Sequence, residues 1–215
     1  MLQFNYQPDP IAIEQESFRQ IRELADLSGF DTEQQQIVMR LVHSLGEPAL
    51  AGQTLISANA VSAGCDALRD NAPILCDVEM VRHGLTKRML QPGQAHCFLN
   101  DPEIPALARQ RGETRTMAAL HKWAPLLDGA VVVIGNAPTA LFRLLEMISE
   151  GAAKPAVVIG IPVGFVGAAE SKQALWQHYQ DLGIECITVA GRWGGSALAA
   201  AACNAMMRIN LGERY

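Results

Sequence analysis

The apolar residues in the last third of the chain fall into three short runs, at residues 130–135, 156–160 and 186–190. Each run is rich in valine or isoleucine, and a turn that contains glycine follows it. A stretch with helical spacing of its apolar residues comes after each turn. Short β-branched runs that alternate with helices are typical of a parallel sheet covered by helices. Ligands of such sheets bind at the carboxyl ends of the strands, where these turns lie.

Two helices are predicted near the start of the chain. Residues 13–27 and 33–45 each place apolar side chains at helical spacing. Asp31 or Thr32 is expected to cap the second helix, and Pro48 prevents its continuation. Before residue 130 the pattern further predicts strands at 54–56 and 74–76, helices at 58–69 and 113–127, and an irregular segment at 91–105.

These elements predict one α/β domain over residues 1–215. We expect three layers, with helices on both faces of a mainly parallel, flavodoxin-like sheet and with extra helices at the N-terminal end. No linker long enough to separate two domains interrupts the chain. A chain of 215 residues can bury one substantial core.

Composition and charge narrow the classes of function. Hydrophobic residues make up 49% of the chain and charged residues 18%, which is typical of a folded globular protein. The formal net charge of −5 argues against a nucleic-acid surface, which needs a basic stripe. No apolar stretch reaches the roughly 20 residues of a membrane span, and residues 1–10 lack the apolar core of a signal peptide. We therefore expect a soluble, cytoplasmic protein that binds neither nucleic acid nor membrane.

The cysteines and histidines indicate neither disulfides nor a metal site. The five cysteines include no pair at C-x-x-C spacing, which favours reduced thiols. We expect Cys76, Cys186 and Cys203 to be small core residues, because their neighbours are apolar. The five histidines form no metal-ligand pattern. No metal is therefore expected.

The three glycine turns are candidate anion sites. A helix that begins directly after a strand presents free backbone N–H groups, and its dipole favours negative charge there. The three helix starts lie at residues 135–136, 167–168 and 194–196. Together with Arg192 in the third turn, they suit a ligand with several negative groups. The alternative is that each glycine only lets the chain turn tightly.

The kind of anion follows from motifs that the chain lacks. It has no G-x-x-x-x-G-K-[ST] loop and no G-x-G-x-x-G after a strand, and these motifs bind nucleotide phosphates. Carboxylates are therefore favoured over phosphates. Asn136, Arg192 and Ser196 lie in or beside the turns and are candidate residues for binding them.

His43 lies on the polar side of the helix predicted over residues 33–45. At 100° per residue it is about 170° from the centre of the apolar stripe, so we do not expect a core histidine. It is either a solvated surface side chain or an acid or base that faces a pocket or a partner subunit. Histidine suits the second role because its unperturbed pKa is about 6.5.

Ser17, Arg115 and Lys172 also carry expectations. Ser17 lies on the packed side of the first helix, where its hydroxyl either bonds to a preceding carbonyl or donates to a ligand. Arg115 lies in the first turn of its helix, where the helix dipole opposes a cation. A carboxylate from Glu113 or from a ligand would compensate for that opposition. Lys172 is expected to be an ordinary surface residue near a helix start.

Several segments together resemble those of one family. They are residues 17–22, 40–43, 72–81, 83–86, 114–116, 135–141, 162–172 and 191–196. The sequences GNAPTAL and PVGFVGAAESK are the most specific of them. In these segments, and in this order over nearly the whole chain, the sequence resembles the precorrin-8X methylmutases of cobalamin (vitamin B12) biosynthesis. Residues 44–48, directly after His43, depart from the family's pattern.

The resemblance implies an isomerase that moves a methyl group from C11 to C12 of precorrin-8X and so gives hydrogenobyrinate. It implies no cofactor, and a tetrapyrrole substrate with many carboxylate arms. The family's catalytic histidine matches His43 and its substrate-contacting serine matches Ser17, while Thr86 and Arg115 match ligand-facing positions. We expect His43, as an imidazolium, to protonate or hydrogen-bond the macrocycle and so ease the methyl shift.

Two alternatives remain open at the level of the sequence. The same reaction on cobalt-precorrin-8 in the anaerobic pathway needs the same core motifs. A carrier that holds the tetrapyrrole product needs the same pocket. The family also implies a homodimer with the pocket near the subunit boundary, and a transient handover of the product to the next enzyme of the pathway.

Overall fold

The computed structural model describes residues 2–215 and contains a six-stranded sheet. Its strands are β1 Thr54–Ile56, β2 Ile74–Cys76, β3 Ala95–His96, β4 Val131–Ile134, β5 Val157–Gly160 and β6 Cys186–Val189. They lie in the order β1-β6-β5-β4-β2-β3, and only β1 is antiparallel to its neighbour. Without β1, this is the strand order of a flavodoxin-like sheet. The predicted sheet is therefore confirmed.

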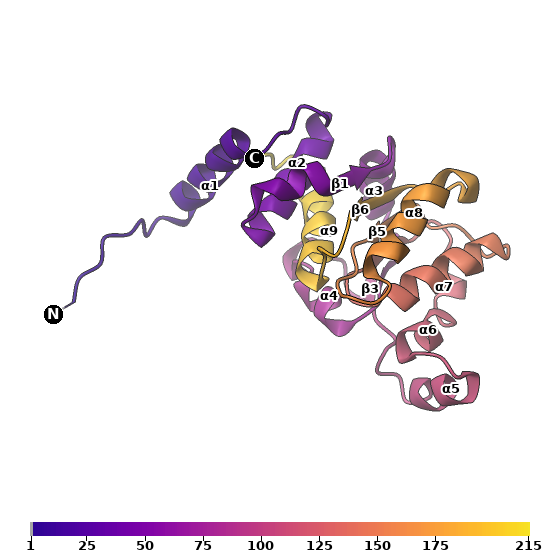
Figure 1. Cartoon of the computed structure of the whole chain (residues 1–215). Coiled ribbons are helices and arrows are strands. Elements are labelled where there is room, and N and C mark those ends of the chain that lie inside the picture. Colours follow the sequence, from indigo (N-terminus) through magenta and orange to yellow (C-terminus); the bar gives the residue numbers. More distant parts are fainter. Residues whose placement is uncertain (1) are drawn as a thin grey trace.

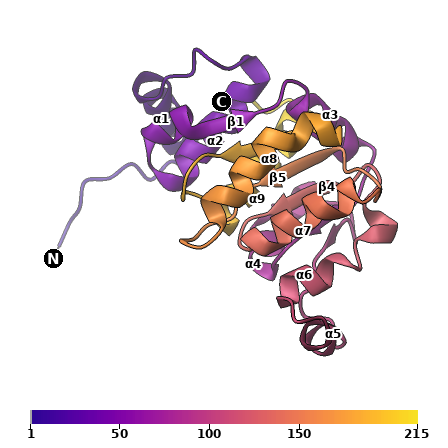
Figure 2. The ribbon, with the colours of Figure 1, turned by 45° about the vertical axis from the view of Figure 1, so that its right-hand side comes forward.

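Helices cover both faces of the sheet (Figure 2). They are α1 Pro10–Leu24, α2 Thr32–Leu45, α3 Ala60–Arg69, α4 Glu79–Gly84, α5 Ile104–Arg111, α6 Arg115–Leu120, α7 Pro138–Ser149, α8 Ala168–Leu182 and α9 Ser196–Asn210. Short 3-10 helices lie at Pro48–Gln53, Lys87–Met89 and Ala124–Leu126. Within residues 2–215, no helix is long and apolar enough to cross a membrane.

Two apolar cores separate the three layers. Along β4, Val131 and Val133 belong to the core that contains α2, α3, α4 and α9. Val132 and Ile134 point the other way, into the core that contains α7 and α8. A strand buried on both faces needs apolar side chains at every position. This explains why the strands appear in the sequence as continuous apolar runs.

The antiparallel strand β1 brings the end of α2 to the carboxyl edge of the sheet. Thr54, the first residue of β1, pairs with Val189, the last residue of β6. The N–H of Ala190 donates to the carbonyl of Gln53 (2.7 Å). Only residues 46–53 separate α2 from β1. The last turn of α2 therefore lies toward the edge where the glycine turns are.

The first helix is shifted three residues toward the N-terminus relative to its prediction. It begins at Pro10 because Asp9 caps it by accepting from the N–H of Ile11 (2.9 Å), and proline suits a first helical position. It ends at Leu24 because Ala25 is extended. Leu24, which was expected on the packed stripe, is exposed.

Pro105 and Pro125 mark helix starts that the sequence pattern missed. Pro105 lies in the first turn of α5. This helix begins inside the segment predicted to be irregular and continues beyond it. Gly112, with a φ of 65°, ends that helix. The helix predicted over residues 113–127 is broken into α6 and the 3-10 turn Ala124–Leu126, which contains Pro125.

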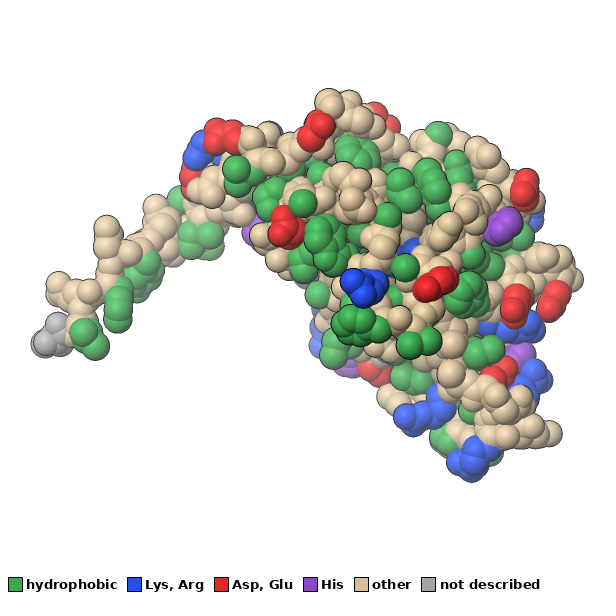
Figure 3. All heavy atoms as spheres, in the orientation of Figure 1, with side chains coloured by type: hydrophobic (Ala, Val, Ile, Leu, Met, Phe, Trp, Pro, Cys, Tyr) green, Lys and Arg blue, Asp and Glu red, His purple; other side chains and the backbone are tan. Residues whose placement is uncertain are grey.

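Residues 2–9 form an extended arm that projects away from the sheet (Figure 1). Its apolar side chains Leu2, Phe4 and Tyr6 are between 74% and 88% exposed. They form a row of hydrophobic groups on the visible face of the arm (Figure 3). Ile11 and Ile13, at the start of α1, are exposed as well.

Candidate active site at the carboxyl edge of the sheet

His43 lies in the last turn of α2, where capping at both ends defines the helix. Asp31 accepts from the N–H groups of Glu33 and Gln34, and the Gln34 side chain accepts from the N–H of Asp31. Gly46 ends the helix with a φ of 72°. The His43 side chain is exposed, as its position opposite the apolar stripe predicted.

Ser17 is the direct partner of His43. Its Oγ lies 2.9 Å from the Nδ1 of His43, and this hydrogen bond joins α1 to α2. Which of the two groups donates depends on the tautomer of the ring. The contact is neither of the two bonds expected for Ser17, because the hydroxyl bonds to a side chain of another helix; its donation to a ligand stays a prediction. The contact leaves Nε2 as the ring nitrogen free to face a ligand.

The ring of His43 stacks on Phe18, with centroids 5.0 Å apart and planes 15° apart. Partial burial lowers the pKa of His43, and the nearby guanidinium groups of Arg40 and Arg208 lower it further, whereas Glu14 raises it. A lower pKa makes the imidazolium a stronger acid. The environment therefore suits proton donation, once a negative ligand has raised the fraction of protonated histidine.

The glycine turn after β4 is occupied by a carboxylate of the chain itself. Asp77, directly after β2, is buried and accepts from the backbone N–H groups of Gly135 (3.1 Å), Asn136 (2.9 Å) and Ala137 (2.8 Å). Burial raises the pKa of Asp77, and these backbone donors oppose the rise. The expectation that this turn offers its N–H groups to a ligand is wrong, because Asp77 already uses them.

The helix starts after β5 and β6 have no such carboxylate. Gly167 precedes α8 and Gly195 precedes α9, and neither helix has a side-chain cap. The first N–H groups of a helix have no partner within it. Ser196, the first residue of α9, is buried. These two helix starts therefore keep the uncapped N–H groups that the prediction requires, and anion binding there stays a prediction.

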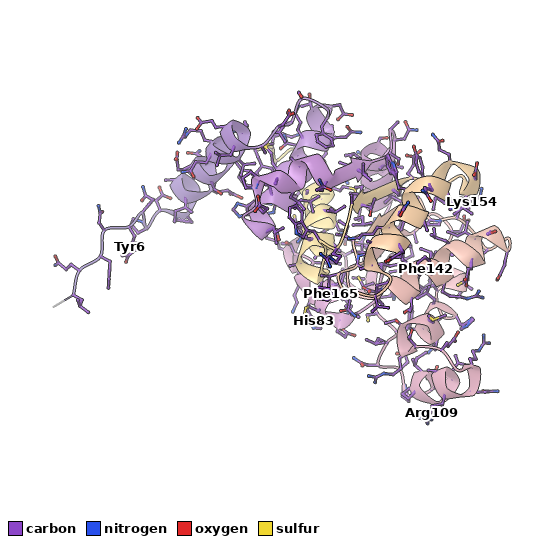
Figure 4. The ribbon with its side chains drawn as sticks, in the orientation of Figure 1. Tyr6, His83, Arg109, Phe142, Lys154 and Phe165 are labelled. Carbon is purple, nitrogen blue, oxygen red and sulfur yellow. The ribbon has the colours of Figure 1, made fainter. Side chains whose placement is uncertain are left out.

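Arg192 lies beside a hollow of about 950 Å³ between these two turns. Its guanidinium lies over the ring of Phe165, 5.5 Å from the centroid. Phe165 is 87% exposed, in the loop before α8 (Figure 4). Exposed Glu170 supplies one carboxylate to the lining. The remaining lining residues are Gln53, Val163, Gly164, Ala169, Ala190, Gly191 and Trp193.

Lys172 is a buried residue beside the candidate site, and sequence reasoning missed its burial. It was expected at the surface, but its side chain is only 1% exposed and its ammonium donates to the carbonyl of Trp193 in the turn before α9. Burial lowers the pKa of Lys172 to about 8. Ala168, Ser171 and Leu175 are buried on the same helix. Their spacing of i, i+3 and i+7 was the available signal, since Lys172 at i+4 shares that face.

The other predicted residues lie on neighbouring elements. The N–H of Thr86, after α4, donates to Oδ1 of Asn204 on α9 (2.9 Å). Arg115 is the exposed first residue of α6, and it makes no ion pair within residues 2–215. The expected partner Glu113 instead lies 3.4 Å from His121. Asn136, in the turn that Asp77 occupies, has an exposed side chain.

The structure thus joins some of the predicted residues and not others. It brings Ser17 and His43 into direct contact, and it places Arg192 and Ser196 around one turn. The hollow beside Arg192 is not lined by His43 or Ser17. Within residues 2–215, no three His, Cys, Asp or Glu side chains gather in a way that could hold a metal ion.

An exposed histidine held by a serine, together with two uncapped helix starts at one sheet edge, is typical of the candidate active site of an α/β enzyme. Comparison with known proteins gives the particular family. The sequence profile of the precorrin-8X methylmutases matches residues 12–209. The chain belongs to this family and is an isomerase of cobalamin biosynthesis.

Individual relatives agree with this assignment over most of their length. The precorrin-8X methylmutase of Sinorhizobium sp is 49% identical over 98% of this chain and all of the relative. The cobalt-precorrin-8 methylmutase of Priestia megaterium is 38% identical over 92% of this chain and 87% of the relative. The crystal structure of a precorrin-8X methylmutase from Thermus thermophilus matches with a TM-score of 0.84 and 38% identity, over 94% of this chain and 97% of that one.

Proposed function

We propose that the chain moves the methyl group of precorrin-8X from C11 to C12 and releases hydrogenobyrinate, with His43 as the acid that assists the shift. The observation that carries the role of His43 is its hydrogen bond to Ser17, which orients an otherwise exposed ring. The metal-free substrate is favoured over cobalt-precorrin-8. The higher identity of the relative named for the metal-free substrate supports this choice.

In the proposed mechanism, His43 donates a proton or a hydrogen bond to the conjugated ring. This polarises the π-system and lowers the barrier to migration of the methyl group, which stays within the same molecule. Arg40 and Arg208 lower the pKa of His43 in the free enzyme. Carboxylates of a bound substrate would offset these cations and return the proton to the ring.

The carboxylate arms of the substrate are assigned to the cationic part of the edge. Arg192 and the starts of α8 and α9, with Ser196, would hold arms on one side. The exposed side chains of Arg115 and Asn136 would serve arms near α7, since Thr114 and Thr139 lie in contact there (3.1 Å). Thr86 is proposed to contact the ring from the side of α4.

The decisive experiment replaces His43 by asparagine. We expect kcat to fall by about 10²–10⁴-fold, the usual worth of a general acid, while binding of the product, followed by its visible spectrum, stays within a few-fold. The matched control is His178→Asn, because His178 is an exposed histidine on α8 outside the candidate site. Full turnover by the His43→Asn variant would overturn the assignment of His43.

The same assay separates the alternative substrates and the carrier function. Purified protein is given an excess of precorrin-8X or of its cobalt form, and the visible spectrum is followed. We expect the metal-free substrate to be converted completely and with the higher kcat/KM. A spectral change that stops at one equivalent of protein would identify a carrier. Faster conversion of the cobalt form would reverse the choice of substrate.

We further propose that two copies of the chain assemble around the site. The exposed apolar residues of the arm and of α1 support this, because exposed apolar groups in a row mark interaction surfaces. A second copy would also enclose His43, because His43 does not line the hollow beside Arg192. We also propose that the enzyme hands its product transiently to the next enzyme of the pathway. Light scattering that gives a monomer with full activity would contradict a shared site.

A further inference from the structure

The residues that follow α9 bring the end of the chain against the helix that carries His43. The N–H of Tyr215 donates to Oε1 of Gln36 on α2 (2.7 Å). The Arg214 guanidinium pairs with Glu33 on the same helix (2.8 Å). In Figure 1 the C-terminal end lies between α1 and α2. The segment lies beyond residues 12–209, which the family profile matches.

Tyr215 forms the base of an aromatic stack beneath His43. Its ring lies 3.7 Å from the ring of Phe18, with planes 13° apart. Phe18 in turn stacks on His43. The guanidinium groups of Arg40 and Arg208 lie 5.7 Å and 5.5 Å from the centroid of the Tyr215 ring. The three rings and two cations therefore form one packed unit that spans α1, α2 and α9.

This unit attaches α1 to α2 and to the end of the chain. Phe18 and Ile21 are the buried residues within α1, and Phe18 is held between His43 and Tyr215. Glu14 of α1 adds an ion pair with Arg208 (3.2 Å). Because α1 also carries Ser17, the position of the Ser17 hydroxyl depends on how firmly Phe18 is held.

We propose that Tyr215 is a positioning residue for the reaction, which holds Phe18 and with it the Ser17–His43 pair in the catalytic arrangement. The contacts indicate that the ring of Tyr215, and not its hydroxyl, positions Phe18. The hydroxyl of Tyr215 is buried without a hydrogen-bond partner within residues 2–215, whereas the ring contacts an aromatic side chain and two guanidinium groups. The proposal rests on the catalytic role of His43.

The test compares Tyr215→Leu with Tyr215→Phe. Leucine fills part of the space but cannot stack, whereas phenylalanine keeps the ring and loses only the unpartnered hydroxyl. We expect Tyr215→Leu to lower kcat by about tenfold or more, since small misplacements of catalytic groups are costly, with KM within about twofold. Tyr215→Phe is expected to retain the kcat that Tyr215→Leu loses. Circular dichroism establishes that both variants are folded.

A second readout follows the titration of His43 by NMR, without substrate. Loosening Phe18 admits water to the ring of His43 and lets the guanidinium groups of Arg40 and Arg208 move away from it, and both changes raise the pKa of His43. Loss of the Glu14 carboxylate would lower this pKa, but by less, because desolvation is the largest influence. The pKa of His43 is therefore expected to rise toward its ordinary value in Tyr215→Leu and to stay low in Tyr215→Phe. This readout is independent of catalysis, so it separates a failure of this proposal from a failure of His43 as the acid.

Three results would overturn the proposal. One is a Tyr215→Leu variant with the kcat and the His43 titration of the unmodified protein. Another is an equal loss of kcat in both variants, which would assign the effect to the hydroxyl. The third is a lower kcat with an unchanged titration of His43, which would mean that Tyr215 acts somewhere other than through the stack.

Discussion

The turn after β4 and the turns after β5 and β6 look alike in the sequence but carry opposite charge arrangements. In the first, the buried carboxylate of Asp77 accepts from three consecutive backbone N–H groups. In the others, the helices α8 and α9 begin without side-chain caps. Buried Lys172 and exposed Arg192 add positive charge there.

The difference assigns separate tasks to the two regions. A turn whose donors are satisfied within the chain contributes to stability and has little to offer a ligand. A turn with free donors and nearby cations is less stable by itself and gains from an added anion. At the crevice between β2 and β4, where flavodoxin-like sheets commonly bind ligands, Asp77 accepts from the backbone donors of the turn. The proposed anion site lies beside it, toward β6.

The largest expected effect tests the closed turn. Asp77→Ala leaves the buried N–H groups of Gly135 and Ala137 without an acceptor. Each buried unsatisfied donor costs about 1–3 kcal/mol, so the free energy of unfolding should fall by about 2–6 kcal/mol. Urea denaturation measures it. Asp128→Ala is the control, because Asp128 is exposed and should change stability by less than about 0.5 kcal/mol. An Asp77→Ala protein of unchanged stability but weakened substrate binding would place this turn in the ligand site.

The next effect tests the buried cation of the open region through pH. Burial lowers the pKa of Lys172 from 10.5 to about 8 in the folded chain. Between these values the unfolded chain binds a proton that the folded chain has released, so stability rises with pH. Below pH 8 the buried ammonium costs on the order of 3 kcal/mol relative to an exposed lysine. Lys172→Met should remove this rise.

Urea denaturation between pH 7 and pH 10 measures the difference between the two proteins. The unmodified chain should gain stability relative to Lys172→Met as the pH rises through 8. The matched control is Lys154→Met, since Lys154 is exposed (Figure 4). Parallel pH curves for the unmodified chain and Lys172→Met would refute the buried charge. We also expect Lys172→Met to raise KM, because its ammonium holds the turn that contains Trp193.

We expect substitution of Arg192 to have the smallest effect on stability. Its effect should fall on substrate binding instead. Arg192→Ala should leave the free energy of unfolding within about 0.5 kcal/mol. It should raise KM about tenfold, since a charged hydrogen bond is worth about 1.5–3 kcal/mol, and reduce the salt dependence of KM. Arg109→Ala, in exposed α5, is the control (Figure 4). Equal KM values for the two variants would remove Arg192 from the site.

Much of the fold was predictable because periodicity is a local property. The strands β2, β4, β5 and β6 and the helices after the last three follow from runs and turns within a dozen residues. The wrongly predicted helix boundaries also have local causes, namely prolines at helix starts. The pattern predicts an irregular segment around Pro105 and one long helix through Pro125, whereas both prolines lie in the first turn of a new helix. Asp9 and Pro10 moved the start of α1 in the same way.

The candidate site was predictable only in part. The polar position of His43 on its helix follows from the spacing of apolar residues, and its exposure confirms it. The hydrogen bond between Ser17 and His43 was not among the options that the sequence offered for Ser17, because the two side chains are 26 residues apart in the chain. Asp77 lies 58 residues or more from the donors that it binds. No local pattern encodes a contact over such a distance, because it depends on the strand order.

The sequence by itself determined the family, the alternation of strands and helices, and the residue types that carry acid chemistry and positive charge. These properties depend on neighbours along the chain. The tertiary structure decided which glycine turn is closed and which is open, that Lys172 is buried, and that Tyr215 supports Phe18 beneath His43. Such outcomes depend on which segments meet in space, and a side chain's charge or hydrogen-bonding capacity becomes structural or functional only when its partner is in place.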